Sequence, residues 1–166
     1  MENKTAIILQ CTKDKQPGKL PAIKSYSGRN FNKILPMVQP LGDIFILSSK
    51  YGLISGDTII EPYDSTFETL PPGYVRDYSL EYRREFRNKG VKQQLKMIPV
   101  VQKQLPILNG YDNIITIMSR NYLSVFNEAG GNKIDYLDWQ EKCGGIFNLP
   151  KHIEKKINEN VNNHIL

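Results

Sequence analysis

A short stretch of this sequence, from Ile46 to Phe67, gathers side chains of the types that act on nucleotides. It reads ILSSKYGLISGDTIIEPYDSTF: an apolar run ends in Ser-Ser-Lys-Tyr-Gly, and a loop with three carboxylates follows. A carboxylate beside a sugar can orient a water molecule or stabilise the positive charge that develops as a glycosidic bond breaks. A tyrosine ring can stack on a base that has left its helix. The stretch is therefore the first candidate for a chemical site.

The segment Glu61-Pro62-Tyr63-Asp64 carries the two candidate catalytic acids, Glu61 and Asp64. Pro62 fixes its own φ and favours an extended conformation at Glu61. In an extended segment Glu61 and Tyr63 point to one side and Asp64 to the other, but a tight turn at Tyr63-Asp64 would bring both carboxylates to one cleft. The alternative is that Asp57, Glu61 and Asp64 are turn formers and helix caps. The pattern does not choose between Glu61 and Asp64.

Three polar strand ends are expected to complete the site, because parallel sheets bind ligands at the carboxyl ends of their strands. Each end is small, polar and cationic, which suits an anion or a polar base. Lysine and arginine would contact phosphates or the departing base, and tyrosines would shape the base pocket. Gly52 is interpreted as a turn requirement and Cys11 as a small buried residue. The candidate substrate-binding residues are Cys11, Lys13, Ser48, Lys50, Tyr51, Gly52, Asp57, Tyr63, Arg120 and Asn121.

The elements that must position these residues alternate between strands and helices. Continuous apolar runs predict buried strands at Ala6–Leu9, Asp43–Ser48 and Ile114–Met118, with a loop from Lys50 to about Pro72. The charged block at 81–89 indicates a solvated helix face. The expected helices are one capped by Ser27 and disturbed by Pro36, one over 79–105 that Gly90 and Pro99 break, one over 122–126 closed by Gly130-Gly131, and a polar tail from about 151.

This alternation predicts a single α/β layered domain over residues 1–166, with a mostly parallel central sheet flanked by helices. A hydrophobic share of 40% in 166 residues is enough for one core. A small further unit from Asp135 to Leu149 contains the single tryptophan, and packing around Trp139 is the favoured interpretation of it.

Composition narrows the class of protein. The formal charge of +5 favours a polyanionic partner such as nucleic acid. Cys11 and Cys143 fit a reducing compartment, and His152 and His164 are too isolated for a metal site, so no metal is expected. The sequence has no phosphate-binding glycine motif and no nucleophile elbow, so no cofactor is expected. Without a predicted signal segment or membrane span, a cytoplasmic protein is expected.

Three sequence patterns together resemble those of small stand-alone proteins related to the YaaA family. The patterns are Cys11-x-Lys13-x-Lys15, the pair Tyr26-Ser27 before a helix, and above all LSSKYGLISGDTIIEPYDSTF. The family is distantly similar to the uracil-DNA-glycosylase-like and archaeosine-synthase-associated domains. The resemblance covers Thr5 to Phe67 well and the strand near Ile114 to Arg120 loosely.

Acids at two positions of the central motif place this chain nearer one branch of these relatives. The peroxide-stress YaaA proteins carry Gln in place of Glu61 and Arg in place of Asp64, whereas this chain resembles the small relatives that include antiviral DNA glycosylases. That resemblance implies a DNA glycosylase that removes a modified base from phage DNA. No Schiff-base arrangement is evident apart from Lys50, so a monofunctional enzyme is expected, without an obligate protein partner. Two alternatives remain open: a tRNA or nucleoside base-exchange enzyme, and a non-catalytic YaaA-like DNA-binding module.

Overall fold

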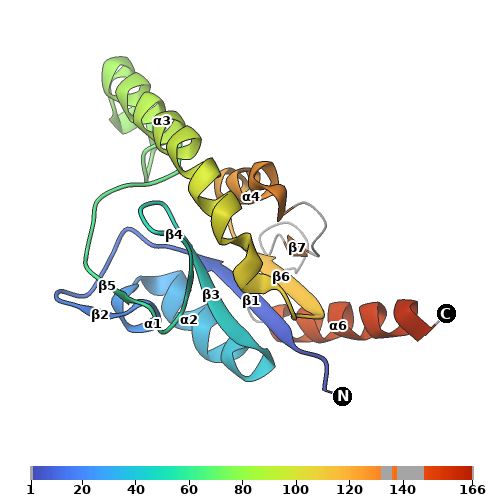
Figure 1. Ribbon diagram of the computed structural model, residues 1–166. Coiled ribbons are helices and arrows are strands. Elements are labelled where there is room, and N and C mark those ends of the chain that lie inside the picture. Colours follow the sequence, from blue (N-terminus) through green and yellow to red (C-terminus); the bar gives the residue numbers. More distant parts are fainter. Residues whose placement is uncertain (1, 132–135, 138–147, 166) are drawn as a thin grey trace.

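The computed structural model describes residues 2–131, 136–137 and 148–165 (Figure 1). In this part of the chain a central sheet has the strand order β4-β3-β1-β6-β7. All neighbouring pairs are parallel except β3 with β4, so the predicted mostly parallel sheet is confirmed. Its strands are β1 (Thr5–Gln10), β3 (Asp43–Ser48), β4 (Gly52–Ser55), β6 (Asn113–Ile117) and β7 (Tyr136–Leu137).

Strand β1 is the centre of the core. Ala6, Ile7 and Ile8 are fully buried, because β1 lies between β3 and β6 and helices cover both faces of the sheet. A strand buried on two faces has no polar side to alternate, which explains the continuous apolar run in the sequence. A separate small antiparallel sheet pairs β2 (Leu20–Pro21) with β5 (Ile59–Ile60).

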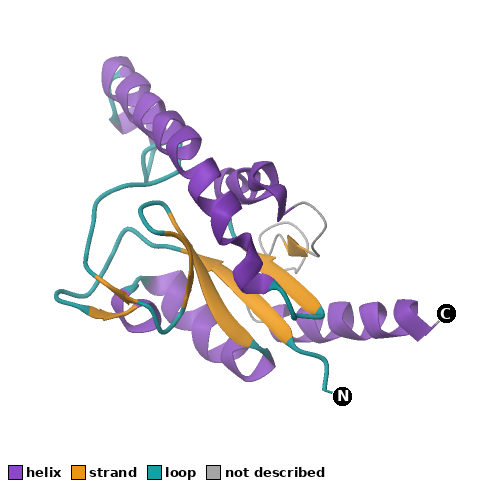
Figure 2. Cartoon of the chain, in the orientation of Figure 1, coloured by secondary structure: helices purple, strands orange, loops and turns teal. Residues whose placement is uncertain are grey.

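Helices flank the sheet in two groups (Figure 2). Helix α3 contacts β4 and α4, whereas α2 and α6 contact each other and α6 contacts β6. Figure 1 shows α3 crossing one face of the sheet, with its N-terminal half projecting beyond it. The described helices are α1 (Ala22–Ser25), α2 (Arg29–Val38), α3 (Leu80–Gln104), α4 (Arg120–Phe126) and α6 (Leu149–Ile165).

Helix α3 corrects one expectation, because Gly90 and Pro99 do not break it. It runs without interruption over 25 residues, and Ser79 caps it by accepting a hydrogen bond from the backbone N–H of Tyr82 at 3.1 Å. Pro99 is exposed, so the helix carbonyl that it leaves without a partner is near water. Gly90 is buried at a close contact described below.

Two further expectations were wrong in detail. Helix α2 begins after Gly28, which provides no side-chain cap, so Ser27 is not the N-cap. The stretch from Lys50 to Pro72 is not all loop, because the chain turns back after β3 and adds β4 antiparallel to it. Gly52 has a φ of +77° at this reversal, which confirms its role as a turn residue.

Some expectations fall outside the described residues. Cys143 and Trp139 are among these, as are most residues of the small unit expected between Asp135 and Leu149. None of the described helices is long and apolar enough to cross a membrane.

Gln104 joins the end of α3 to the edge strand β4, and this gives a stability prediction. The Leu53 N–H donates to Gln104 Oε1 at 2.8 Å, and Gln104 Nε2 donates to the Tyr51 carbonyl at 2.9 Å. Gln104→Ala should lower the free energy of unfolding by about 1–3 kcal/mol, because the buried Leu53 N–H loses its partner. Urea unfolding checks this, with exposed Gln102→Ala as the control. Equal stability of the two variants would contradict it.

Candidate functional site

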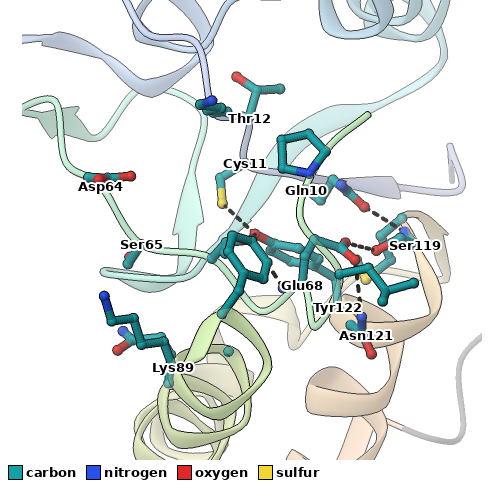
Figure 3. A pocket seen from close by; sticks show the side chains of 18 of the residues that line it. Gln10, Cys11, Thr12, Asp64, Ser65, Glu68, Lys89, Ser119, Asn121 and Tyr122 are labelled. Atoms are coloured by element: carbon teal, nitrogen blue, oxygen red, sulfur yellow. Dashed lines mark hydrogen bonds between the residues drawn. The ribbon is translucent and has the colours of Figure 1, made fainter. Parts of the chain in front are cut away.

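The carboxyl ends of β1 and β6 enclose the candidate site. The chain runs from β1 to β3 on one side and then crosses to β6 on the other, so the strand order reverses between β1 and β6. Open α/β sheets bind ligands outside such a reversal. A cavity of about 1310 Å³ opens there, and Figure 3 shows side chains from both strand ends meeting in it.

Glu68 presents its carboxylate at the floor of this cavity (Figure 3). Ser119 Oγ donates to Glu68 Oε1 at 2.6 Å, and Asn121 Nδ2 donates to Glu68 Oε2 at 3.0 Å. The backbone N–H of Ser119 also donates to Gln10 Oε1 at 2.5 Å, which ties the end of β6 to the end of β1. Both carboxylate oxygens are therefore held by side chains that follow β6, so the group is fixed in position before any ligand binds.

A close contact with α3 brings Glu68 to this place. A Cβ atom added at Gly90 would lie 2.1 Å from the Glu68 carbonyl oxygen, so only glycine lets the two backbones approach this far. One turn further along α3, Gln94 Nε2 donates to the Phe67 carbonyl at 2.6 Å. The Phe67 ring is fully buried and packs against Tyr122, with ring centroids 4.8 Å apart.

Buried hydroxyls and a thiol form a second layer around the cavity. Cys11 Sγ lies 3.2 Å from Tyr122 Oη and donates to Ser49 Oγ at 3.7 Å. Ser49 Oγ donates to the Ser65 carbonyl at 2.7 Å, and Gln93 Nε2 donates to the Ser49 carbonyl at 2.5 Å. Burial raises the pKa of Tyr122 above the ordinary tyrosine range, so its phenol stays protonated at neutral pH. Cys11 is buried, as predicted.

A chain of hydroxyls anchors the acidic loop to the sheet. Tyr63 Oη lies 2.7 Å from Tyr26 Oη and 2.7 Å from Ser48 Oγ. Lys15 Nζ stands 4.2 Å from the centroid of the Tyr63 ring. Burial raises the pKa of Tyr63 and of Tyr26, so both phenols stay protonated at neutral pH and form hydrogen bonds without acting as bases. Tyr63 therefore positions the loop and does not line the cavity.

Five of the predicted residues line the cavity: Cys11, Lys13, Asp64, Arg120 and Asn121. Asp64 lies near Lys15, a cavity residue whose pKa is lowered by burial while the neighbouring acidic groups of Cys11, Asp64 and Asp14 act in the opposite direction. Asp64 is exposed, so it belongs to the outer part of the cavity wall.

The other predicted residues lie outside the cavity: Ser48, Lys50, Tyr51, Gly52, Asp57, Glu61 and Tyr63. Glu61 is exposed and its Oε1 is 3.5 Å from Lys19 Nζ. Asp57 is exposed in the turn after β4. Residues 61–66 form no turn, so the structure does not bring Glu61 and Asp64 to one cleft.

Several residues of this site were not predicted, among them Glu68, Gln10, Tyr122 and Gln93. Glu68 lies one residue beyond the quoted stretch, Gln10 directly precedes Cys11, and Tyr122 directly follows Asn121. Their positions next to the predicted residues were a usable signal. The sequence around Gln93 offered no such signal, because its hydrogen bond to the Ser49 carbonyl depends on how α3 packs against the end of β3.

No group of three or more His, Cys, Asp or Glu in the described part of the chain could hold a metal ion.

Comparison with known proteins adds a family and no activity. Residues 6–124 match the model of a family of unknown function, DUF6884. No curated protein and no solved structure matches the chain. The likeness to YaaA-related proteins therefore stays a prediction.

Gly90→Ala tests the contact that positions Glu68. The added Cβ would force the Glu68 backbone away, so we expect the free energy of unfolding to fall by about 2 kcal/mol. This loss should exceed the gain of about 1 kcal/mol that alanine has over glycine within a helix. Urea unfolding measures it, with the exposed Asn88→Ala on the same helix as control. A Gly90→Ala protein more stable than the wild type would show that the contact is not tight.

Proposed function

Because the chain belongs to the DUF6884 family, whose description assigns no activity, we propose a function from the residues of its own cavity. The protein is a DNA glycosylase that hydrolyses the N-glycosidic bond of a modified nucleobase and leaves an abasic site. The observation that carries the proposal is the Glu68 carboxylate, held by Ser119 and Asn121 at the floor of a cavity with many cationic side chains.

Glu68 supplies the chemistry of this reaction. Its carboxylate orients a water molecule toward C1′ of the deoxyribose and stabilises the positive charge that develops on the sugar. The C1′–N bond breaks, and its electron pair leaves with the base. The water oxygen bonds to C1′, and its proton passes through Glu68 to the departing base. The products are the free base and an abasic site, and the balance needs no further reactant.

The charges around the cavity favour a phosphate-bearing substrate. Among the described residues, six cationic and two acidic ones line it, so a DNA backbone is attracted to the walls while the acids remain beside the reacting sugar. A module that only binds DNA gains nothing from a fixed carboxylate at the floor, because it repels phosphates. The cationic residues are Lys13, Lys15, Lys89, Lys92, Lys96 and Arg120.

The size of the cavity favours a polymer over a free nucleoside. Its volume of about 1310 Å³ exceeds the roughly 300–1,000 Å³ of small-molecule sites. One flipped nucleotide therefore leaves room for its neighbours in the strand or for a bulky modification.

The resemblance to antiviral DNA glycosylases suggests which DNA is attacked. Hypermodified phage DNA would provide bulky bases that the host lacks, and an enzyme acting on it would work in the cytoplasm. The proposed role is therefore defence against phages that modify their DNA.

Replacing Glu68 by Gln tests the proposal. Purified protein is incubated with unmodified DNA and with hypermodified phage DNA, abasic sites are cut with alkali, and the strands are sized. The wild type should produce breaks in the modified DNA and release the free base. Glu68→Gln should lower the excision rate by about 10²–10⁴-fold, because the carboxylate that handles the proton is gone.

Glu61→Gln is the matched control, since Glu61 is an exposed acid of the same segment outside the cavity. It should excise at the wild-type rate. Loss of excision in Glu61→Gln with full excision in Glu68→Gln would return the catalytic role to Glu61. Intact strands in every DNA would refute the glycosylase, and incorporation of a labelled free base into tRNA would then identify a base-exchange enzyme.

A further inference from the structure

Helix α3 carries the whole excess of positive charge in the protein. Residues 80–104 include seven lysines and arginines but only two glutamates, an excess of five. The formal charge of the full chain is also +5, so the remaining residues balance to zero. A charge excess confined to one helix attracts a polyanion to that helix and not to the protein surface in general.

A row of aromatic rings lies along the cavity at the start of this helix. Tyr78, which precedes α3, lines the cavity together with Tyr82 and Phe86, which are four residues apart on one face of α3. The rings of Tyr78 and Tyr82 are stacked, 16° from parallel with centroids 5.1 Å apart, and the Phe86 ring is 6.4 Å from that of Tyr82. Tyr78 Oη donates to the Pro72 carbonyl at 2.7 Å, which fixes the first ring of the row.

This row leads to the candidate catalytic group. Gly90, which contacts the backbone of Glu68, lies four residues beyond Phe86 on the same face of α3. Lys89, Lys92 and Lys96 line the cavity beside the row. Rings for stacking and cations for phosphates therefore lie together, next to the carboxylate.

We infer that the aromatic row of Tyr78, Tyr82 and Phe86 binds single-stranded nucleic acid and leads an unpaired strand to Glu68. The inference rests on the proposed function, since base excision at Glu68 is what would follow binding. It adds that the substrate is an unpaired strand. Flat aromatic rings bind bases whose faces are open, and the faces of bases inside a duplex are covered by their neighbours at about 3.4 Å. Tyr82 is 45% exposed, so part of its ring is accessible to an unpaired base.

Binding to short unmodified probes tests this without any excision. Fluorescence anisotropy is measured with the full-length Glu68→Gln protein and three fluorescein-labelled probes: a 12-nucleotide oligo-dT, an oligo-U of the same length, and a 12-base-pair duplex. We expect oligo-dT to bind at least about tenfold more tightly than the duplex at equal salt. The oligo-U arm distinguishes DNA from RNA, and tight binding of either single strand supports the inference.

Variants of the row supply the matched comparison. Tyr82→Ala should weaken oligo-dT binding by about 5- to 100-fold, and Tyr82→Trp should retain it, because stacking needs only a flat ring. Tyr74→Ala is the control: Tyr74 is 71% exposed in the segment before α3 but does not line the cavity. Circular dichroism should show that the variants fold alike.

Charge variants test the phosphate contacts separately. Lys89→Gln should lower the slope of log affinity against log salt by about 0.7, the value for one single-strand phosphate. Lys103→Gln, exposed on the same helix but outside the cavity, should leave the slope unchanged.

Equal or tighter binding of the duplex would overturn the inference, as would equal effects of Tyr82→Ala and Tyr74→Ala. These outcomes are separable from those of the excision assay. If the protein binds oligo-dT through Tyr82 but never excises a base, the inference of single-strand binding holds and the proposed glycosylase activity is refuted. If it excises bases from duplex DNA and shows no preference for single strands, the glycosylase proposal holds and the inference of single-strand binding is refuted.

Discussion

Helix α3 and the segment Phe67–Glu68 approach one another closely because residue 90 has no side chain. The carbonyl of Glu68 occupies the space that a Cβ would need, and Gln94 secures the neighbouring Phe67 carbonyl. Because of this contact the chain crosses the end of the sheet at Phe67–Glu68, and the Glu68 carboxylate lies within hydrogen-bond distance of Ser119 and Asn121. The cavity, its floor and its aromatic wall all depend on it.

The sheet supplies the complementary constraint. Reversal of the strand order beside β1 leaves the carboxyl ends of β1 and β6 adjacent, as the strand order requires for a ligand site. Hydroxyls then hold the loop after β5: Tyr63 reaches Ser48 and Tyr26, and Ser49 reaches Ser65. Burial keeps these phenols protonated, so the network is an uncharged, hydrogen-bonded support for the loop.

The positive charge and the fixed carboxylate come from different elements of the fold. The positive excess of the sequence lies on α3, and Lys89, Lys92 and Lys96 of that helix line the same cavity as Glu68, so α3 attracts a polyanion toward the strand ends. Hydrogen bonds from Ser119 and Asn121 hold the carboxylate there.

The sequence by itself determined the three strands β1, β3 and β6, the mostly parallel sheet and the strand ends at which a site would lie, but not the edge strand β4. Continuous apolar runs such as Ala6–Leu9 depend only on local burial, and turn residues such as Gly52 only on local backbone geometry. The tertiary structure alone decided which acid reaches the cavity. Glu61 and Glu68 are both glutamates in the stretch after β5, but Glu61 faces solvent beside Lys19, and the contact at Gly90 brings Glu68 inward. That contact joins residues distant in sequence, and no local pattern encodes it.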